Sequence, residues 1–135
     1  MSARRRSRLI AAQALYAYDM GNTRQDLMDG FLAETKIAQK YKEFAVSLFE
    51  KTCANLSAID AEIASKISKE WSLDRLGRME LAVLRLACCE IMFGGSDAPI
   101  AINEALDLIK MFADEHAPPF INGVLEAIRK QRISA

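Results

Sequence analysis

The chain has 135 residues, no formal net charge and three cysteines. This length suits one domain, or two small helical bundles that share a core. An odd number of cysteines, two of them adjacent, does not make a disulfide framework, so we expect a reducing, cytoplasmic environment. No apolar run reaches the ~20 residues that a membrane-spanning helix needs. A single histidine and no Cys-X-X-Cys pair provide no zinc-binding motif.

The charges are distributed unevenly along the chain. Residues 1–18 contain Arg4, Arg5, Arg6 and Arg8 and no acidic side chain, whereas the rest is mildly acidic. A basic N-terminus is typical of proteins that bind nucleic acid or an anionic surface. The alternative is a solvated, disordered tail without a partner.

The first helix is expected from about Ser2 to Met20, because Gly21 is a good C-terminal stop signal. A second stripe on this helix runs from Arg5 to Tyr16 and could present cations and an aromatic ring together. The core face of the first helix is expected to consist of Ala11, Ala14, Leu15 and Tyr18.

Three more helices are expected at about residues 26–34, 38–55 and 57–69. The first three helices could form a small bundle. The fourth carries an isoleucine every four residues and leads to Trp71, after which residues 72–74 should turn the chain into the fifth helix.

The fifth helix, residues 76–93, is apolar over most of its circumference, which is typical of a buried helix. Arg78 and Arg85 lie about 20° apart on its helical wheel, and they predict the one stripe that faces water. Glu80 and Glu90 fall within the apolar sector, where a carboxylate needs a partner.

The last two helices have complete amphipathic stripes. The sixth follows Gly94 and Gly95, and its core face is expected to extend as far as Phe112. The seventh starts near Pro118, and Gly123 in its interior suggests close helix packing. No segment has the alternation of a strand, so the chain is predicted to be all-α with about seven helices.

Binding is a better functional class than catalysis. The sequence contains no convincing nucleophile with its base, metal cluster or phosphate-binding loop. The arginines could attract RNA phosphates, with Tyr16 and Phe120 as nearby stacking surfaces, although aromatic residues on helices are more often in the core. For Glu80 the alternatives are a salt bridge within the fold and a contact with a partner protein.

Three segments resemble the NusB family of transcription antitermination factors, in order and at similar spacing. These segments are RRRSRLIAAQALY, WSLDRLGRMELAVLRLACCE and AINEALDLIKMFADEHAPPFINGVL. The pairing of the INEA motif with the later F-[IV]-NG-V-L motif is the most specific part of the resemblance.

The resemblance implies two helical subdomains, with three helices in residues 1–56 and four in residues 57–135. It also implies binding to single-stranded boxA RNA together with NusE, a ribosomal protein of the small subunit. This complex would join others on RNA polymerase and suppress termination, notably in ribosomal RNA operons. Neither catalysis nor a cofactor is implied.

The family's functional positions can be carried over residue by residue. By this resemblance, Tyr16 and Phe120 would be RNA-side residues, and Glu80 would lie at the surface for NusE or next to the RNA. Asn103, Glu104 and Asn122 also match, but we interpret them as making helix-end and interhelical hydrogen bonds. The residues expected to hold RNA phosphates are Arg4, Arg5, Arg6 and Arg8.

The sequence is also compatible with other functions. A NusB-like domain also precedes some ribosomal RNA methyltransferases, so the chain could be the RNA-recognition module of such an enzyme. It could instead be a purely protein-binding helical scaffold. An apolar face could also pair two copies of the chain as a homodimer.

Overall fold

The computed structural model describes residues 1–21, 24–67, 76–112 and 116–134, excluding the side chains of residues 24–27, 29 and 133–134. Within these residues the chain has seven helices and no strand, which confirms the predicted all-α fold. The turn expected around Trp71 lies outside the described residues. The helices are α1 (Ala3–Asp19), α2 (Arg24–Ala33), α3 (Gln39–Ala54), α4 (Leu56–Lys66), α5 (Arg78–Phe93), α6 (Ala98–Ile109) and α7 (Ala117–Ser134).

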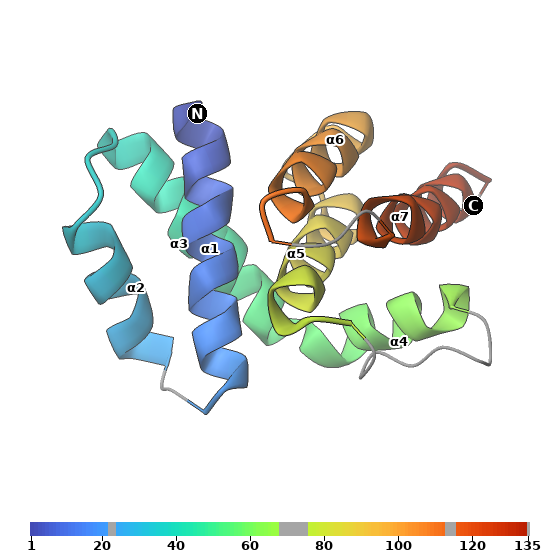
Figure 1. Cartoon of the computed structure of the whole chain (residues 1–135), viewed down its shortest axis with the longest axis horizontal. Coiled ribbons are helices and arrows are strands. Elements are labelled where there is room, and N and C mark those ends of the chain that lie inside the picture. Colours follow the sequence, from blue (N-terminus) through green and yellow to red (C-terminus); the bar gives the residue numbers. More distant parts are fainter. Residues whose placement is uncertain (22–23, 68–75, 113–115, 135) are drawn as a thin grey trace.

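The helices form two adjoining groups (Figure 1). Helices α2 and α3 pack against α1, and α4, α6 and α7 pack around α5. Helix α1 also packs along α5, and one continuous hydrophobic core extends through both groups. The two groups contain the helices expected for the two subdomains. Because both groups share one core, the division into subdomains near residue 56 stays a prediction.

Helix α5 is the central helix, as its apolar circumference predicted. Every residue from Leu81 to Glu90 is buried except Arg85. The expected water-facing stripe is wrong for Arg85, whose side chain is only 12% exposed. Its Nε and Nη2 atoms donate to the two carboxylate oxygens of Asp60 in α4, at 2.8 and 2.9 Å. Arg78 is exposed and pairs with Asp19 at the end of α1, at 2.8 Å.

Local signals set the ends of α1 and α5. Ser2 caps α1, because its Oγ accepts a hydrogen bond from the backbone N–H of Arg5 at 3.2 Å. Helix α5 stops at Gly94 (φ 80°), which is followed by Gly95 (φ 105°). Both φ values lie in the region that favours glycine, so this pair can reverse the chain into α6.

Helices α6 and α7 bury the apolar stripes predicted for them, with two differences. Phe112 is 40% exposed and is not on the core face, because α6 ends at Ile109 and helical spacing no longer applies. Close packing at Gly123 is also wrong: this residue is exposed, and a Cβ added there would meet no atom within 4 Å. The buried stripes include Ile102, Ala105 and Ile109 of α6 and Ile121, Val124, Leu125 and Ile128 of α7.

Candidate nucleic-acid interface

The basic N-terminus is part of a helix. Helix α1 begins at Ala3, so the alternative of a disordered basic tail is wrong. Ser7 is fully buried and donates a hydrogen bond to the backbone carbonyl of Tyr41 at the start of α3, at 2.9 Å. This contact holds the first turns of α1 against the fold.

The structure places Arg8 in the interior. Its side chain is 5% exposed and pairs with Glu90 of α5, which is 4% exposed, through Nη2 and Oε1 at 2.9 Å. Arg8 Nε also donates to Glu90 Oε2 at 3.2 Å. Ser96 completes the cluster, since its hydroxyl donates to Glu90 Oε1 at 2.7 Å and accepts from Arg8 Nη2 at 3.1 Å. Arg8 is therefore buried and paired within the fold, and Glu90 has the cationic partner that its position in the apolar sector of α5 required.

Arg5 connects α1 to α6. Its Nε donates to Glu104 Oε2 at 2.7 Å, and its Nη2 donates to Glu104 Oε1 at 3.3 Å and to Asp107 Oδ2 at 2.7 Å. The hydrogen bond from Arg5 lowers the pKa of Glu104, although partial burial opposes this shift. The same hydrogen bond raises the pKa of Arg5. The interhelical role expected for Glu104 is thus confirmed.

Arg4 and Arg6 are the exposed members of the cluster. The Arg4 guanidinium lies over the ring of Phe44 in α3, with Cζ 4.5 Å from the ring centroid. Arg6 makes no hydrogen bond or ion pair with a side chain in the described part of the chain. The four arginines therefore divide into Arg4 and Arg6, which are exposed, and Arg5 and Arg8, which pair with carboxylates of other helices.

The other expected site residues are Tyr16, Glu80 and Phe120, which belong to three different helices. Tyr16 is 37% exposed near the end of α1, and Phe120 is half-buried in the first turn of α7. Half-buried Glu80 has a local role at the start of α5, where its Oε2 accepts from the backbone N–H of Gly77 at 3.4 Å. No hydrogen bond or ring contact between described residues links Tyr16 or Glu80 to the arginines.

Two partners of the arginines, Phe44 and Asp107, were not predicted from the sequence. The Phe44 ring also makes a second cation–π contact, since Arg8 Cζ lies 5.2 Å from its ring centroid. Asp107 could have been recognised, because it lies one helical turn after Glu104.

The hydrogen bonds expected for two asparagines are wrong. Asn103 and Asn122 are exposed, and neither makes the expected side-chain hydrogen bond to a described residue.

The described residues offer little for chemistry. They contain no group of three or more His, Cys, Asp or Glu side chains that could hold a metal ion. Burial raises the pKa of Cys88 to about 12, so this thiol is not ionised at neutral pH. None of the helices described is both long and apolar enough to cross a membrane. Arg4 and Arg6, exposed at the start of α1, form a cationic edge on this helical framework that is suited to binding an anion.

The NusB family model and two related proteins match nearly the whole chain in sequence. The NusB family model matches residues 5–130. The transcription antitermination protein NusB of Sulfurimonas denitrificans is 43% identical over 133 residues, which are 98% of this chain and 100% of that protein. The NusB protein of Wolinella succinogenes is 44% identical over 130 residues, which are 96% of each.

Solved structures show the same fold. A complex of the antitermination factors NusB and NusE with double-stranded RNA matches with a TM-score of 0.86 and 33% identity, over 97% of this chain and 98% of that one. NusB from Aquifex aeolicus matches with a TM-score of 0.80 and 36% identity, over 99% of this chain and 92% of that chain.

The seven-helix fold and the cationic edge define a small all-α binding protein. Together with the sequence matches, they identify its family: the chain belongs to the NusB family. Membership of a family of antitermination proteins agrees with the interpretation of the chain as a binding protein rather than an enzyme.

Proposed function

We propose that this chain is a non-catalytic RNA-binding protein that acts with NusE in transcription antitermination. The observation that carries the proposal is the position of Arg4 and Arg6, exposed at the start of an anchored helix. Ser7 ties this helix to α3 and Arg8 ties it to α5, so the exposed cations stand on a fixed surface. Preorganised cations bind phosphates without the entropy cost of ordering a tail.

The proposed ligand is single-stranded boxA RNA. Arg4 and Arg6 would contact its phosphates, and the exposed ring of Tyr16 and the half-buried ring of Phe120 would stack on its bases. Glu80 would contribute to the NusE surface. Arg8 would act indirectly, because its buried pair with Glu90 fixes the helix that carries the other arginines. The likeness to a structure of NusB and NusE with double-stranded RNA supports NusE and an RNA as partners.

The complex would join RNA polymerase and suppress termination, notably during ribosomal RNA synthesis. An RNA-binding factor that acts on nascent transcripts works in the bacterial cytoplasm, and we place the chain there. The antitermination proteins that match it do so over nearly their full length, which favours this role over that of a methyltransferase module.

Fluorescence anisotropy of labelled boxA RNA tests the proposal. The chain would be titrated with and without NusE, beside a scrambled single strand and an RNA duplex. We expect boxA to bind more tightly than the scrambled strand, and NusE to increase this difference. Equal affinity for both strands, unaffected by NusE, would contradict the proposal.

The double variant Arg4→Gln/Arg6→Gln locates the site. It should weaken boxA binding roughly tenfold and reduce the salt slope by about 1.4, since each phosphate contact to a single strand contributes about 0.7. The matched control is Lys130→Gln/Arg132→Gln, which removes two exposed cations from the far end of α7. Equal losses in the two double variants would show that only net charge matters and would exclude a site on α1.

A further inference from the structure

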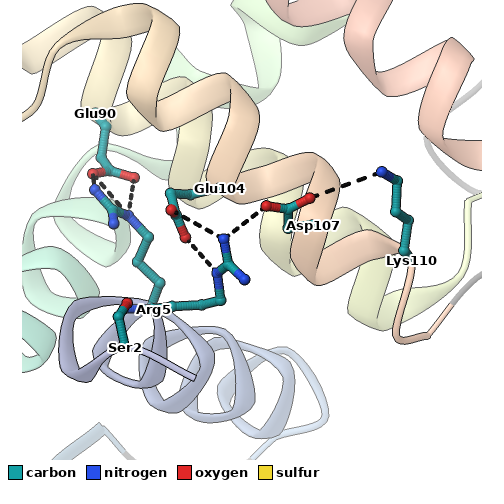
Figure 2. A network of polar contacts seen from close by, with 7 residues as sticks. Ser2, Arg5, Glu90, Glu104, Asp107 and Lys110 are labelled. Atoms are coloured by element: carbon teal, nitrogen blue, oxygen red, sulfur yellow. Dashed lines mark hydrogen bonds and ion pairs between the residues drawn. The ribbon is translucent and has the colours of Figure 1, made fainter.

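The Arg5 guanidinium is shared between two carboxylates of α6 that differ in how firmly they hold it (Figure 2). We propose that Asp107 competes with an RNA phosphate for Arg5. RNA binding then moves Asp107 from Arg5 to Lys110, while Glu104 keeps its hold on Arg5. This inference rests on the RNA-binding function proposed above and names a residue that sets the affinity of the same site.

Glu104 is the firmer of the two partners. It receives hydrogen bonds from both Nε and Nη2 of Arg5, and its side chain is 20% exposed. Asp107 receives one hydrogen bond, at 2.7 Å from Nη2, and its side chain is 41% exposed. Water and salt screen the more exposed contact more strongly, so it is the one that a competing anion can break.

Lys110 offers Asp107 a second partner. Its Nζ lies 3.8 Å from Asp107 Oδ1, the oxygen that does not face Arg5, and its side chain is 66% exposed. Figure 2 shows Asp107 between the two cations, with one oxygen directed to each. Asp107 can therefore leave Arg5 without becoming an unpaired charge. The cost of releasing Arg5 is reduced accordingly.

Arg5 is within reach of the RNA but is neutralised in the free protein. It lies between Arg4 and Arg6 in the first turns of α1, and its side chain is 32% exposed. Its Nη1 donates no hydrogen bond to any residue that the structure describes. Arg5 and Lys110 balance the two carboxylates of Glu104 and Asp107, so the cluster has no formal net charge, and Arg5 adds no net attraction for phosphate while Asp107 holds it. Asp107 thus lowers RNA affinity by occupying Nη2.

A double-variant cycle tests the competition, with boxA RNA and NusE as above. Asp107→Asn removes the charge but keeps the size and an acceptor oxygen, so the fold is retained. We expect it to tighten RNA binding roughly two- to fivefold, the range that an exposed ion pair supplies. In the Arg5→Gln background the same change should have no effect, because the cation under competition is gone.

Asp97→Asn is the matched control. It makes the same change at an exposed position ten residues earlier in the chain, about 15 Å away along α6. Its side chain makes no capping hydrogen bond, so the change should cost no stability. It should leave the affinity unchanged.

The outcomes separate this inference from the function on which it rests. If Asp107→Asn tightens binding equally with and without Arg5, or no more than Asp97→Asn does, the effect is one of net charge and the competition is overturned. Unchanged or weaker binding by Asp107→Asn also overturns it. If the competition is overturned but Arg4→Gln/Arg6→Gln still weakens binding in the same assay, the proposed function is supported without the competition. A wild-type chain that does not bind RNA overturns both.

Discussion

The Arg8 guanidinium and the Glu90 carboxylate form a buried ion pair that joins α1 to α5. Both charges are almost completely removed from water, so each depends on the other for compensation. Arg8 follows the exposed Arg4 and Arg6 on the same helix. The pair therefore links the stability of the fold to the placement of the proposed RNA-binding edge.

Removing Arg8 should destabilise the chain strongly. Arg8→Met leaves the Glu90 charge buried and unpaired, which should lower the free energy of unfolding by about 3–5 kcal/mol. Urea denaturation followed by circular dichroism measures this change. Arg6→Gln is the control, since Arg6 is exposed and should shift the same quantity by less than about 0.5 kcal/mol.

Removing both charges separates a structural role from a direct RNA contact. The double variant Arg8→Met/Glu90→Leu leaves no unpaired charge and should recover most of the lost stability. If Arg8 acts only through the fold, this variant should bind boxA RNA as the wild-type chain does. Weak RNA binding by a fully stable double variant would instead show that Arg8 itself contacts RNA.

The helices could be predicted because their signals are local. The apolar circumference of α5, the Ser2 cap and the stripes of α6 and α7 all follow from residues within a few positions of one another. One error fell where periodicity was carried past a helix end, at Phe112. The exposure of Gly123 could have been recognised, because this residue lies about 200° from Ile121 on the helical wheel, opposite the buried stripe of α7.

The roles of the four arginines could not be predicted from local sequence. In the sequence they form one basic cluster, but Arg8 meets Glu90 across 82 positions and Arg5 meets Glu104 across 99. Which arginine is buried depends on how α1 packs against α5 and α6. One signal was available: a glutamate in the apolar sector of α5 required a cation, and α1 is the most arginine-rich helix in the sequence.

The lowered pKa of Glu104 predicts a loss of stability in acid. The hydrogen bond from Arg5 keeps Glu104 ionised to lower pH in the folded chain than in the unfolded chain. Its stabilising effect is therefore complete above the usual pKa of 4.5 and is lost as the pH falls through the lowered folded value. Wild-type chain should be more stable than Glu104→Gln at about pH 7, and this difference should shrink by about pH 3.

Urea denaturation at the two pH values measures the effect of Glu104. Glu43→Gln, at an exposed position on α3, is the matched control and should differ little from wild type at either pH. A difference between wild type and Glu104→Gln that stays constant from neutral to acid pH would contradict the linkage to Arg5.

The same substitution at two glycines should have opposite effects. Gly94 ends α5 with φ 80° and ψ −170°, a conformation that is almost exclusive to glycine, so Gly94→Ala should lower the free energy of unfolding by about 1–3 kcal/mol. Gly123 lies within α7, where an added Cβ meets no atom within 4 Å. Gly123→Ala should raise the same free energy by about 0.5–1 kcal/mol, since alanine loses less entropy in a helix. Urea denaturation compares both variants with wild type, and destabilisation by Gly123→Ala would show that this face of α7 is not open.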